Sequence, residues 1–337
     1  MKKIVTFGEV MMRLSPSVNN KSIKKTEEYK KYFGGSEANV AYTIASYGAP
    51  AKFVSFLPSN PLGEEAIYAL YHKNLDTETV RFSNKGRLGI YFLEEDYKNF
   101  TRNALYYRDG SSFALSKRED YNWEEILKDA SLFHFSGITP ALSPEMPLIC
   151  EDACLVAKMM GIPISIDINY RKSLWDKETA KKVMQKLCYY ADVLFINEDE
   201  FSLLGIEETA DALLDDPLKF KKAAQQVCEN YSVQTVASAR RSASKSWDSL
   251  LDIKAMIYQW TNRGFILTVS KTFPIFPIDL NGAGDSFAGG VLYALYCEKM
   301  STKRAINFAA ATCALKHQCI GDLNTPHLEL IKKFQKR

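Results

Sequence analysis

Short apolar runs alternate with longer helical patterns along most of the chain. The strand-like runs are 3–8, 52–57, 132–135, 162–168, 193–196 and 233–237, and the helical segments between them are 36–47, 146–161, 177–191 and 217–230. Strands that alternate with helices of this length form βαβ units, which place the strands side by side in a parallel sheet. The later strands are almost entirely apolar, as expected when helices cover both faces. The alternation therefore predicts an α/β fold with a mostly parallel central sheet.

Two regions, 10–33 and 87–110, interrupt this alternation. They lack long helical patterns but contain short runs of alternating apolar and polar residues. Antiparallel strands inserted at these two places, forming a small second sheet, would explain both regions. We expect a single domain over residues 1–337 in which this sheet is a lid over a ligand cleft. A purely structural edge sheet and a dimer contact are the alternatives.

The composition limits the classes of partner. The 337 residues are 46% hydrophobic and 25% charged, and 43 basic against 40 acidic residues give a formal net charge of +3. Such a small surplus gives no electrostatic reason to expect binding to nucleic acid or to a membrane surface. No window approaches 18 uninterrupted apolar residues, so we expect no membrane span. The first residues do not resemble a signal peptide.

The cysteines and histidines indicate a reducing compartment and no dedicated metal centre. Seven cysteines occur without any Cys-x-x-Cys pair, which favours free thiols and a cytoplasmic protein. The four histidines include no pair with zinc-type spacing.

Polar groups follow three successive strands at the point where each strand ends. They are Ser136 with Gly137, the segment 169–171, and the segment 197–200. In an open parallel sheet, ligands bind beyond the carboxyl ends of the strands. Three such ends in a row indicate a binding site at this edge of the sheet.

The segment 279–287, Asp-Leu-Asn-Gly-Ala-Gly-Asp-Ser-Phe, is the clearest chemical signal in the chain. Gly282 and Gly284 allow a tight turn at the start of an amphipathic helix, where backbone N–H groups favour phosphate oxygens. Asp285 in the first turn could accept a proton from a substrate hydroxyl, as phosphoryl transfer requires. The alternative is an ordinary helix start with an Asp cap. A second glycine-rich helix start at 33–39 weakens that alternative.

These two glycine-rich segments resemble the two signatures of the ribokinase-like (pfkB) carbohydrate kinases. The matching residues are Gly34-Gly35 with Asn39, and Asn281 to Asp285. The resemblance covers nearly the whole chain and implies a three-layer α/β/α fold with a small β-sheet lid. Within the family, the segments 106–110, 136–142 and 167–171 are most similar to the 2-keto-3-deoxygluconate kinases.

The resemblance implies a role for each matching position. Asp285 would be the catalytic base, Gly282, Ala283 and Gly284 the anion hole, Gly34 and Gly35 the backbone contacts to the sugar, Tyr91 and Tyr106 the contacts to its hydroxyls, and Arg108 and Arg171 the contacts to its acid group. A planar guanidinium can hold a carboxylate in a bidentate pair, which a neutral sugar does not need. A single arginine is more often a surface ion-pair partner.

The nucleotide side departs from the family pattern. Gly282 and Gly284 would contact the nucleotide, Asn197 would bind near its phosphates, and Glu200 would hold Mg²⁺ through water, although an acidic first helical turn also explains these last two residues. The loop expected at 238–247 has no glycine, whereas the family carries several there. Arg240 or Arg241 is the candidate cation in its place.

These expectations combine into one functional hypothesis. A sugar-acid kinase would use ATP and Mg²⁺ to phosphorylate the terminal hydroxyl of 2-keto-3-deoxygluconate. A kinase for fructose or for 5-dehydro-2-deoxygluconate is the closest alternative, and a silent sugar-binding protein on the same scaffold is another. We further expect a cytoplasmic homo-oligomer, a dimer formed through the lid or larger, whose ligands are small molecules.

Overall fold

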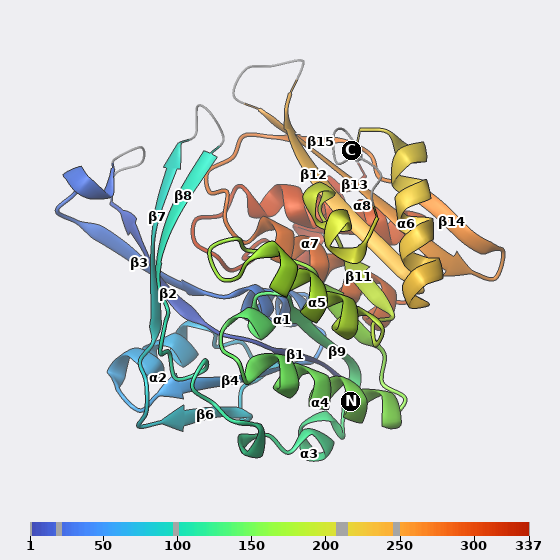
Figure 1. Ribbon diagram of the computed structural model, residues 1–337. Helices are drawn as coiled ribbons and strands as arrows, with labels where there is room; N and C mark the ends of the chain where they lie inside the picture. Colours follow the sequence, from blue (N-terminus) through green and yellow to red (C-terminus); the bar gives the residue numbers. More distant parts are fainter. Residues whose placement is uncertain (1, 18–21, 97–100, 207–214, 245–249, 337) are drawn as a thin grey trace.

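A mostly parallel sheet forms the centre of the computed structural model, which describes residues 2–17, 22–96, 101–206, 215–244 and 250–336 (Figure 1). Among these residues the sheet has eleven strands in the order β14-β13-β12-β11-β10-β9-β1-β4-β5, with β15 beside β13 and β6 beside β4. The strands from β12 to β6 pair in parallel, and β13 to β15 add antiparallel pairs at one end. The strands are β1 (Lys3–Phe7), β4 (Ala51–Pro58), β5 (Leu75–Asp76), β6 (Val80–Ser83), β9 (Ala130–Ser136), β10 (Ile164–Asp167), β11 (Val193–Phe195), β12 (Thr235–Ala243), β13 (Leu251–Thr261), β14 (Gly264–Val269) and β15 (Phe273–Ile275).

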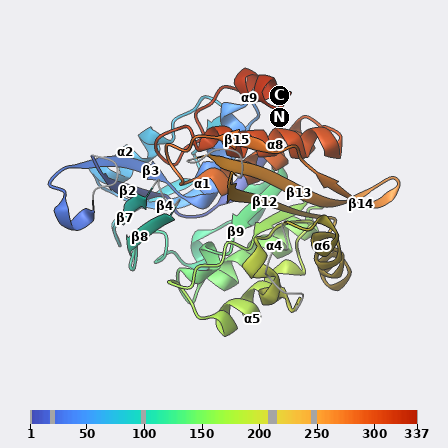
Figure 2. The same cartoon turned by 90° about the horizontal axis from the view of Figure 1, so that it is seen from above.

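Helices cover both faces of this sheet, which gives three layers (Figure 2). The group α3 to α6 covers one face, and α1, α7 and α8 cover the other. The helices are α1 (Ser36–Ser46), α2 (Pro61–Ala69), α3 (Trp123–Leu127), α4 (Met146–Met159), α5 (Lys177–Cys188), α6 (Pro217–Tyr231), α7 (Ala283–Leu292), α8 (Thr302–Lys316) and α9 (Leu328–Phe334). No helix among the described residues is long and apolar enough to cross a membrane.

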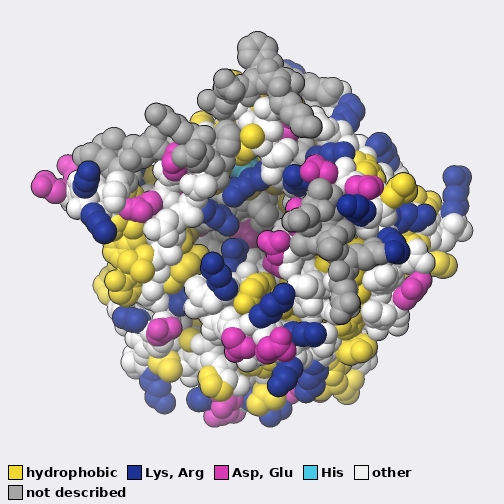
Figure 3. All heavy atoms as spheres, turned by 45° about the horizontal axis from the view of Figure 1, so that its top comes forward, with side chains coloured by type: hydrophobic (Ala, Val, Ile, Leu, Met, Phe, Trp, Pro, Cys, Tyr) yellow, Lys and Arg dark blue, Asp and Glu magenta, His cyan; other side chains and the backbone are white. Residues whose placement is uncertain are grey.

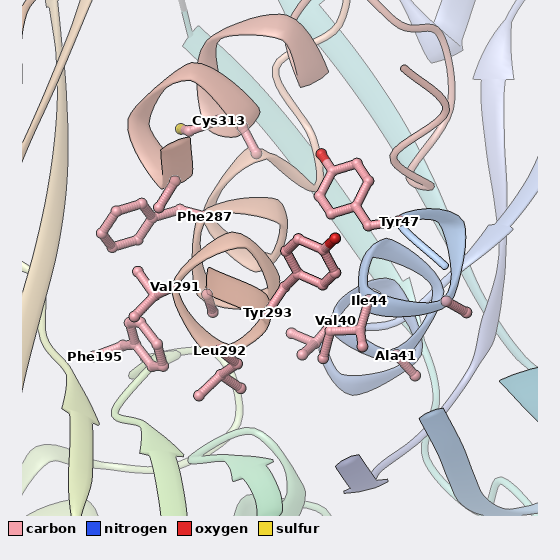
Figure 4. Packing of buried hydrophobic residues seen from close by; sticks show 14 of the residues in the cluster. Val40, Ala41, Ile44, Tyr47, Phe195, Phe287, Val291, Leu292, Tyr293 and Cys313 are labelled. Carbon is pink, nitrogen blue, oxygen red and sulfur yellow. The ribbon is translucent and has the colours of Figure 1, made fainter. Parts of the chain in front are cut away.

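Two apolar clusters, one on each face of the sheet, form the core. On one face, Val40 and Ile44 of α1 lie opposite Leu292 and Tyr293 at the end of α7 (Figure 4). The two helices approach closely at Gly289, where a Cβ atom would lie 2.8 Å from the Cβ of Thr43. This close packing holds the second half of α7 against the second half of α1.

A separate four-stranded sheet stands at one side of the molecule (Figure 1). Its order is β3-β2-β7-β8, with β2 (Met11–Pro16), β3 (Tyr29–Gly34), β7 (Gly89–Asp96) and β8 (Thr101–Tyr107). The second sheet was expected at this place, but the expectation that its strands are all antiparallel was wrong, because β2 and β7 pair in parallel. Both strands follow connections that leave the central sheet in the same direction. Residues 18–21 and 97–100 of the two predicted insertions lie outside the described residues.

The structure confirms the predicted α/β class, and the predicted strands and helices occur at their positions within a few residues. The segment 238–247 differs from the prediction of a loop. Strand β12 continues to Ala243 and pairs with β13 along its length, from Thr235 opposite Gln259 to Ala243 opposite Leu251. The segment contains no glycine that would favour a turn, and β13 provides a paired residue opposite each residue of β12. Residues 245–249 lie outside the described residues.

Candidate active site

Two adjoining pockets lie at the carboxyl ends of the central strands, beside the second sheet. Both are lined by Asn169, Arg171, Asn281 and Asp285. The smaller one is lined by residues of β2, β7 and β8 and the start of α1; the larger one by β12 and the start of α7. Figure 3 shows the hollow on this face, with Lys and Arg side chains gathered around it. The strand ends therefore border two pockets at the edge where the sequence predicts a binding site.

The first turn of α7 has the backbone features of a helix start that can bind an anion. The helix begins after Gly282, whose φ of 73° is a left-handed conformation that favours glycine. A Cβ atom at this position would also lie 2.2 Å from the carbonyl oxygen of Asp322. Gly282, Ala283 and Gly284 all line the larger pocket, and the space beside Gly284 is open. The free N–H groups and the dipole of a helix N-terminus favour phosphate oxygens in this position.

Asp285 lies where the two pockets meet. One carboxylate oxygen accepts a hydrogen bond from Oγ of Ser36 at 2.9 Å, and the other accepts one from Nδ2 of Asn39 at 2.7 Å. Burial raises the pKa of Asp285, while these hydrogen bonds and the positive charge of Arg171 oppose the shift. A carboxylate that is oriented in this way and is more basic than usual can act as a general base.

Gly34 and Gly35 line the smaller pocket through their backbone. A Cβ atom at Gly35 would lie 1.9 Å from the carbonyl oxygen of Glu9, and one at Gly34 would lie 2.3 Å from the Cβ of Asp322. No side chain fits at either position without moving backbone or a buried neighbour. The two glycines therefore let the chain at the end of β3 pack closely against Glu9 and Asp322 in the wall of the smaller pocket.

Tyr91 and Tyr106 extend from neighbouring strands of the second sheet into the wall of the smaller pocket. Their rings stack with centroids 5.5 Å apart. The hydroxyl of Tyr91 donates to Asp322 and accepts from Nδ2 of Asn281 at 2.9 Å. Tyr106 is more exposed, at 38%. Its position suits contact with a ligand, whereas the hydroxyl of Tyr91 is already engaged by protein groups.

The two arginines predicted to bind an acid group have different surroundings. Arg108 is buried and forms an ion pair with Glu9, to which its Nε donates at 2.9 Å. Arg171 is half-buried at the junction of the pockets, and no carboxylate among the described residues forms an ion pair with it. Both line the smaller pocket. Arg171 is thus the arginine whose charge is available to a ligand.

Two buried acidic side chains, Glu200 after β11 and Asp167 at the end of β10, lie near the larger pocket. Both oxygens of Glu200 accept backbone N–H bonds, from Tyr170 at 2.8 Å and from Asn197 at 2.7 Å. Asn197 lines the larger pocket, whereas Glu200 is not among the lining residues of either pocket. Asp167 does line it, and its pKa is raised well above the usual value by burial and by the charges of Glu200 and Asp285. The water-mediated metal role of Glu200 stays a prediction.

Three arginines line the larger pocket besides Arg171. Arg240 and Arg241 are neighbours on β12, and Arg240 forms an ion pair with Asp215. Arg102 of β8 donates to Oδ1 of Asn281 at 2.8 Å. The described residues contain no group of three or more His, Cys, Asp or Glu side chains placed to hold a metal ion.

A buried network joins the second sheet to the loop before α7. The guanidinium of Arg13 donates to Asp279 at 2.8 Å, to Asp322 at 3.3 Å and to Glu95 at 3.3 Å. Glu95 also accepts the backbone N–H of Leu280 at 2.7 Å. Opposite charges and hydrogen bonds satisfy the buried guanidinium. The network fixes the edge of the second sheet to the segment that leads into the anion hole.

Sequence reasoning missed several residues that line the site. These are Glu9, Ser36, Arg102, Asp167 and Asp322. Ser36 and Asp167 lie within the segments 33–39 and 167–171, so that a position-by-position reading of those segments could have found them. Glu9 directly follows the apolar run 3–8. Arg102 and Asp322 carry no local signal, because only the folding of distant segments brings them to the pockets.

The chain is similar to known sugar kinases over almost its full length. Residues 1–328 match the family model described as pfkB family carbohydrate kinase. The crystal structure of 2-dehydro-3-deoxygluconokinase from Thermotoga maritima has a TM-score of 0.91 and 38% identity, covering 100% of this chain and 98% of that one. The 2-dehydro-3-deoxygalactonokinase of Haloferax volcanii is 28% identical over 322 residues, which are 95% of this chain and 92% of the relative.

A more distant structure shares the fold. A putative ribokinase II from E. coli, in complex with ATP and Mg²⁺, has a TM-score of 0.82 and 21% identity, with 100% of both chains covered. The family match spans both glycine-rich segments, and the structure places them at one site, with Asp285 hydrogen-bonded to the helix that follows Gly35. The chain therefore belongs to the pfkB family of carbohydrate kinases.

Proposed function

We propose that this protein transfers the γ-phosphate of ATP to the terminal hydroxyl of 2-keto-3-deoxygluconate (2-dehydro-3-deoxygluconate), giving 2-keto-3-deoxy-6-phosphogluconate and ADP. The observation that carries the proposal is Arg171, a half-buried arginine without an ion-pair partner among the described residues, placed beside Asp285. A sugar acid brings a carboxylate that pairs with such a guanidinium. The similarity to a kinase of this acid, at 38% identity, supports the same substrate class.

The sugar acid would occupy the smaller pocket and ATP the larger one. Gly34, Gly35 and Tyr106 line the sugar side, and Gly282 to Gly284 line the nucleotide side. The terminal hydroxyl would then lie next to Asp285, which lines both pockets and directly follows the anion hole in the sequence. This arrangement brings acceptor and donor together in a fixed geometry, which is much of what phosphoryl transfer needs.

In the proposed reaction, Asp285 accepts the proton of the terminal hydroxyl as that oxygen bonds to the γ-phosphorus. The bond between the γ-phosphorus and the β–γ bridging oxygen breaks, and ADP leaves. Ser36 and Asn39 orient this carboxylate through their hydrogen bonds. Backbone N–H groups at the start of α7 stabilise the negative charge on the transferred phosphoryl group.

The residues near Asp167 fit a magnesium ion. Mg²⁺ keeps much of its water and is usually held by one or two carboxylates together with phosphates. Burial and neighbouring acids raise the pKa of Asp167, so that a cation beside it would favour its ionised form. We propose that Asp167 faces the ion from the larger pocket and that Glu200 acts through water. Bound there, the ion would neutralise phosphate charge.

One observation favours a second candidate, a kinase for a neutral sugar. The charge of Arg108 is balanced by Glu9, which leaves a single arginine for the acid group instead of two. Oε1 of Glu9 is buried and has no hydrogen-bond partner, so that it could accept a bond from a sugar hydroxyl. The discriminating experiment is a substrate panel.

ADP release should be measured with ATP and Mg²⁺ for 2-keto-3-deoxygluconate, its C4 epimer 2-keto-3-deoxygalactonate, 5-dehydro-2-deoxygluconate, fructose and ribose. We expect kcat/KM for the first acid to exceed that for fructose by at least about 100-fold, since losing a buried charge partner costs on the order of 2–5 kcal/mol. Equal efficiency on fructose would refute the acid assignment and leave the kinase assignment intact.

The arginine itself is tested by substitution. Arg171→Ala should raise KM for the acid by about 30-fold or more while changing the weak activity on fructose little. Arg87→Ala is the matched control, because Arg87 is exposed and, within the described part of the chain, its side chain donates to the carbonyl oxygen of Asp109 alone. If activity on the acid and activity on fructose fall to the same degree, Arg171 does not bind the carboxylate of the substrate.

A further inference from the structure

Lys316, the last residue of α8, is a fully buried lysine outside both pockets. Its Nζ donates to three backbone carbonyl oxygens: Asn281 at 2.8 Å, Gly321 at 2.7 Å and Cys319 at 3.2 Å. Among the described residues, no carboxylate forms an ion pair with it. Burying such a group is costly unless its donors are satisfied, and here carbonyl oxygens satisfy them.

The three contacts require the charged form of the side chain. An ammonium has three donors and no acceptor, whereas a neutral amine would direct its lone pair at one of the carbonyl oxygens. Lys316 therefore places a full positive charge inside the protein, held by backbone dipoles rather than by an acid. Arg13, by contrast, is buried with three carboxylates around it.

The charge lies directly behind the anion hole. Asn281, whose carbonyl oxygen faces Lys316, immediately precedes Gly282, and a Cβ atom on Gly282 would lie 3.3 Å from Cε of Lys316. In a trans peptide the C=O and the following N–H point in opposite directions. The bond from Lys316 to Asn281 thus turns the N–H of Gly282 away from the lysine, and Gly282 lines the larger pocket.

Lys316 also ties this turn to the segment that carries Asp322. Its contacts to the carbonyl oxygens of Cys319 and Gly321 hold the chain just before Asp322, whose own carbonyl oxygen packs against Gly282. One side chain therefore joins the end of α8, the 319–322 segment and the turn that begins α7.

We propose that Lys316 is a positioning residue for phosphoryl transfer. Its ammonium fixes the backbone turn at Asn281 and Gly282, and it adds a permanent positive charge behind the N–H groups that receive the phosphate. It touches neither substrate. The proposal rests on phosphoryl transfer at this site, but it does not depend on which sugar is the acceptor.

The experiment removes the charge and then returns it. Lys316→Ala leaves a cavity that is lined by three carbonyl oxygens. An ammonium ion from solution can enter this cavity and replace the lost ammonium group of the side chain. We expect kcat to fall about 10²–10³-fold, the range for loss of an oxyanion-hole donor, with KM for the sugar changed less than about threefold. Ammonium chloride should restore at least about 10-fold of the lost kcat, and tetramethylammonium chloride at equal ionic strength should not.

The matched control lies on the same helix. Lys303 of α8 donates to the carbonyl oxygen of Val269 at 2.8 Å from an exposed position. Lys303→Ala should keep the wild-type kcat and show no response to ammonium. Thermal melting of each variant shows whether it folds. Should Lys316→Ala fail to fold, Lys316→Gln, which keeps N–H donors without the charge, is measured in its place and should lose kcat in the same way.

Two results would overturn the proposal. A folded Lys316 variant with wild-type kcat would show that the charge does nothing for the reaction. A loss of kcat accompanied by an equal rise in KM, with no response to ammonium, would show a structural role only. Binding of a non-hydrolysable ATP analogue is a second measurement, expected to weaken in Lys316→Ala and to recover with ammonium. It tests Lys316 even if the wild type phosphorylates none of the sugars, a result that would refute the proposed function separately.

Discussion

Asp285 is oriented by hydrogen bonds at both carboxylate oxygens, so that its direction is set before a substrate binds. Those bonds lower the pKa of this carboxyl, while burial raises it and prevails. Since a stronger base accepts a proton more readily, the net shift favours its proposed role. Ser36 and Asn39 lie in the first half of α1, and their hydrogen bonds join it to the first turn of α7, which carries Asp285.

Asp285→Asn tests this role directly. The substitution keeps the size of the side chain but removes the charge and the proton acceptor. We expect kcat to fall about 10²–10⁴-fold, the usual effect of losing a general base, while sugar and ATP still bind. The melting temperature should stay close to that of the wild type. A variant with most of its turnover intact would rule out Asp285 as the base.

Residues within continuous motifs were predictable from the sequence, and those joined only by folding were not. Gly34, Gly35 and the turn from Gly282 to Asp285 each lie in a glycine-rich segment that opens a helix, and the structure places them around the two pockets. Arg102 reaches Asn281 across 179 positions of sequence. No local pattern marks such a pair, because its geometry depends on how the second sheet lies over the central one.

At the scale of elements, β12 shows why the nucleotide side was predicted less well. The family resemblance predicts a loop for the segment after Ala237. Its residues instead continue the strand, since β13 offers an antiparallel partner at every position to Ala243. Arg240 and Arg241 are therefore consecutive residues of a regular strand that borders the larger pocket. Strand pairing over such a distance follows from tertiary structure and cannot be seen in one segment.

The second sheet is proposed to act as a lid over the sugar. ATP must be shielded from water, or it would be hydrolysed without an acceptor. Contacts from Arg13, Glu95 and Arg102 to the 279–281 segment show how the sheet reaches the anion-hole side. Most of β8 is exposed to solvent, so that its backbone hydrogen bonds can open easily.

Hydrogen exchange tests the lid. We expect exchange in β7 and β8 to slow at least about 10-fold when the sugar acid and a non-hydrolysable ATP analogue bind together, because both strands line or adjoin the smaller pocket. Strand β14, at the far end of the central sheet, is the internal control and should not change. Unchanged exchange in β7 and β8 would favour a fixed structural sheet.

At the scale of the whole molecule, the layered α/β architecture was predictable because each element signals its own type. Apolar runs of strand length and amphipathic helices recur in order, and right-handed βαβ connections leave few arrangements for them. The antiparallel end of the sheet, β13 and β14, was not predicted, because the mixed polar and apolar sequence of this hairpin does not resemble the buried parallel strands.

Stability should depend on pH through Glu37, which links α1 to the end of β9. Oε1 of Glu37 accepts bonds from Oγ and N of Ser136 and from Oγ1 of Thr139, each at 2.8 Å. Burial raises its pKa from 4.5 to about 7, despite these bonds. Because the folded value lies above the unfolded one, the stabilising contribution is complete below pH 4.5 and is lost as the pH rises through 7.

Urea unfolding of the wild type and Glu37→Gln at pH 5 and pH 8 measures this contribution. Glutamine does not titrate. Between pH 5 and pH 8, the wild type should therefore lose about 2–3 kcal/mol of unfolding free energy relative to Glu37→Gln. Parallel pH profiles of the two proteins would show that Glu37 has the same pKa in the folded and unfolded states.

The Arg13 network also bears on the order in which the molecule is made. Arg13 precedes its partner Asp279 by 266 positions and Asp322 by 309. On the ribosome, the strands beside the sugar pocket emerge long before the acids that hold them against the anion hole. The strands beside the smaller pocket are therefore made early, whereas Asp285, the proposed base, and the helix start proposed to receive phosphate are made late. Under the proposed function, a chain that ends before residue 279 is expected not to consume ATP.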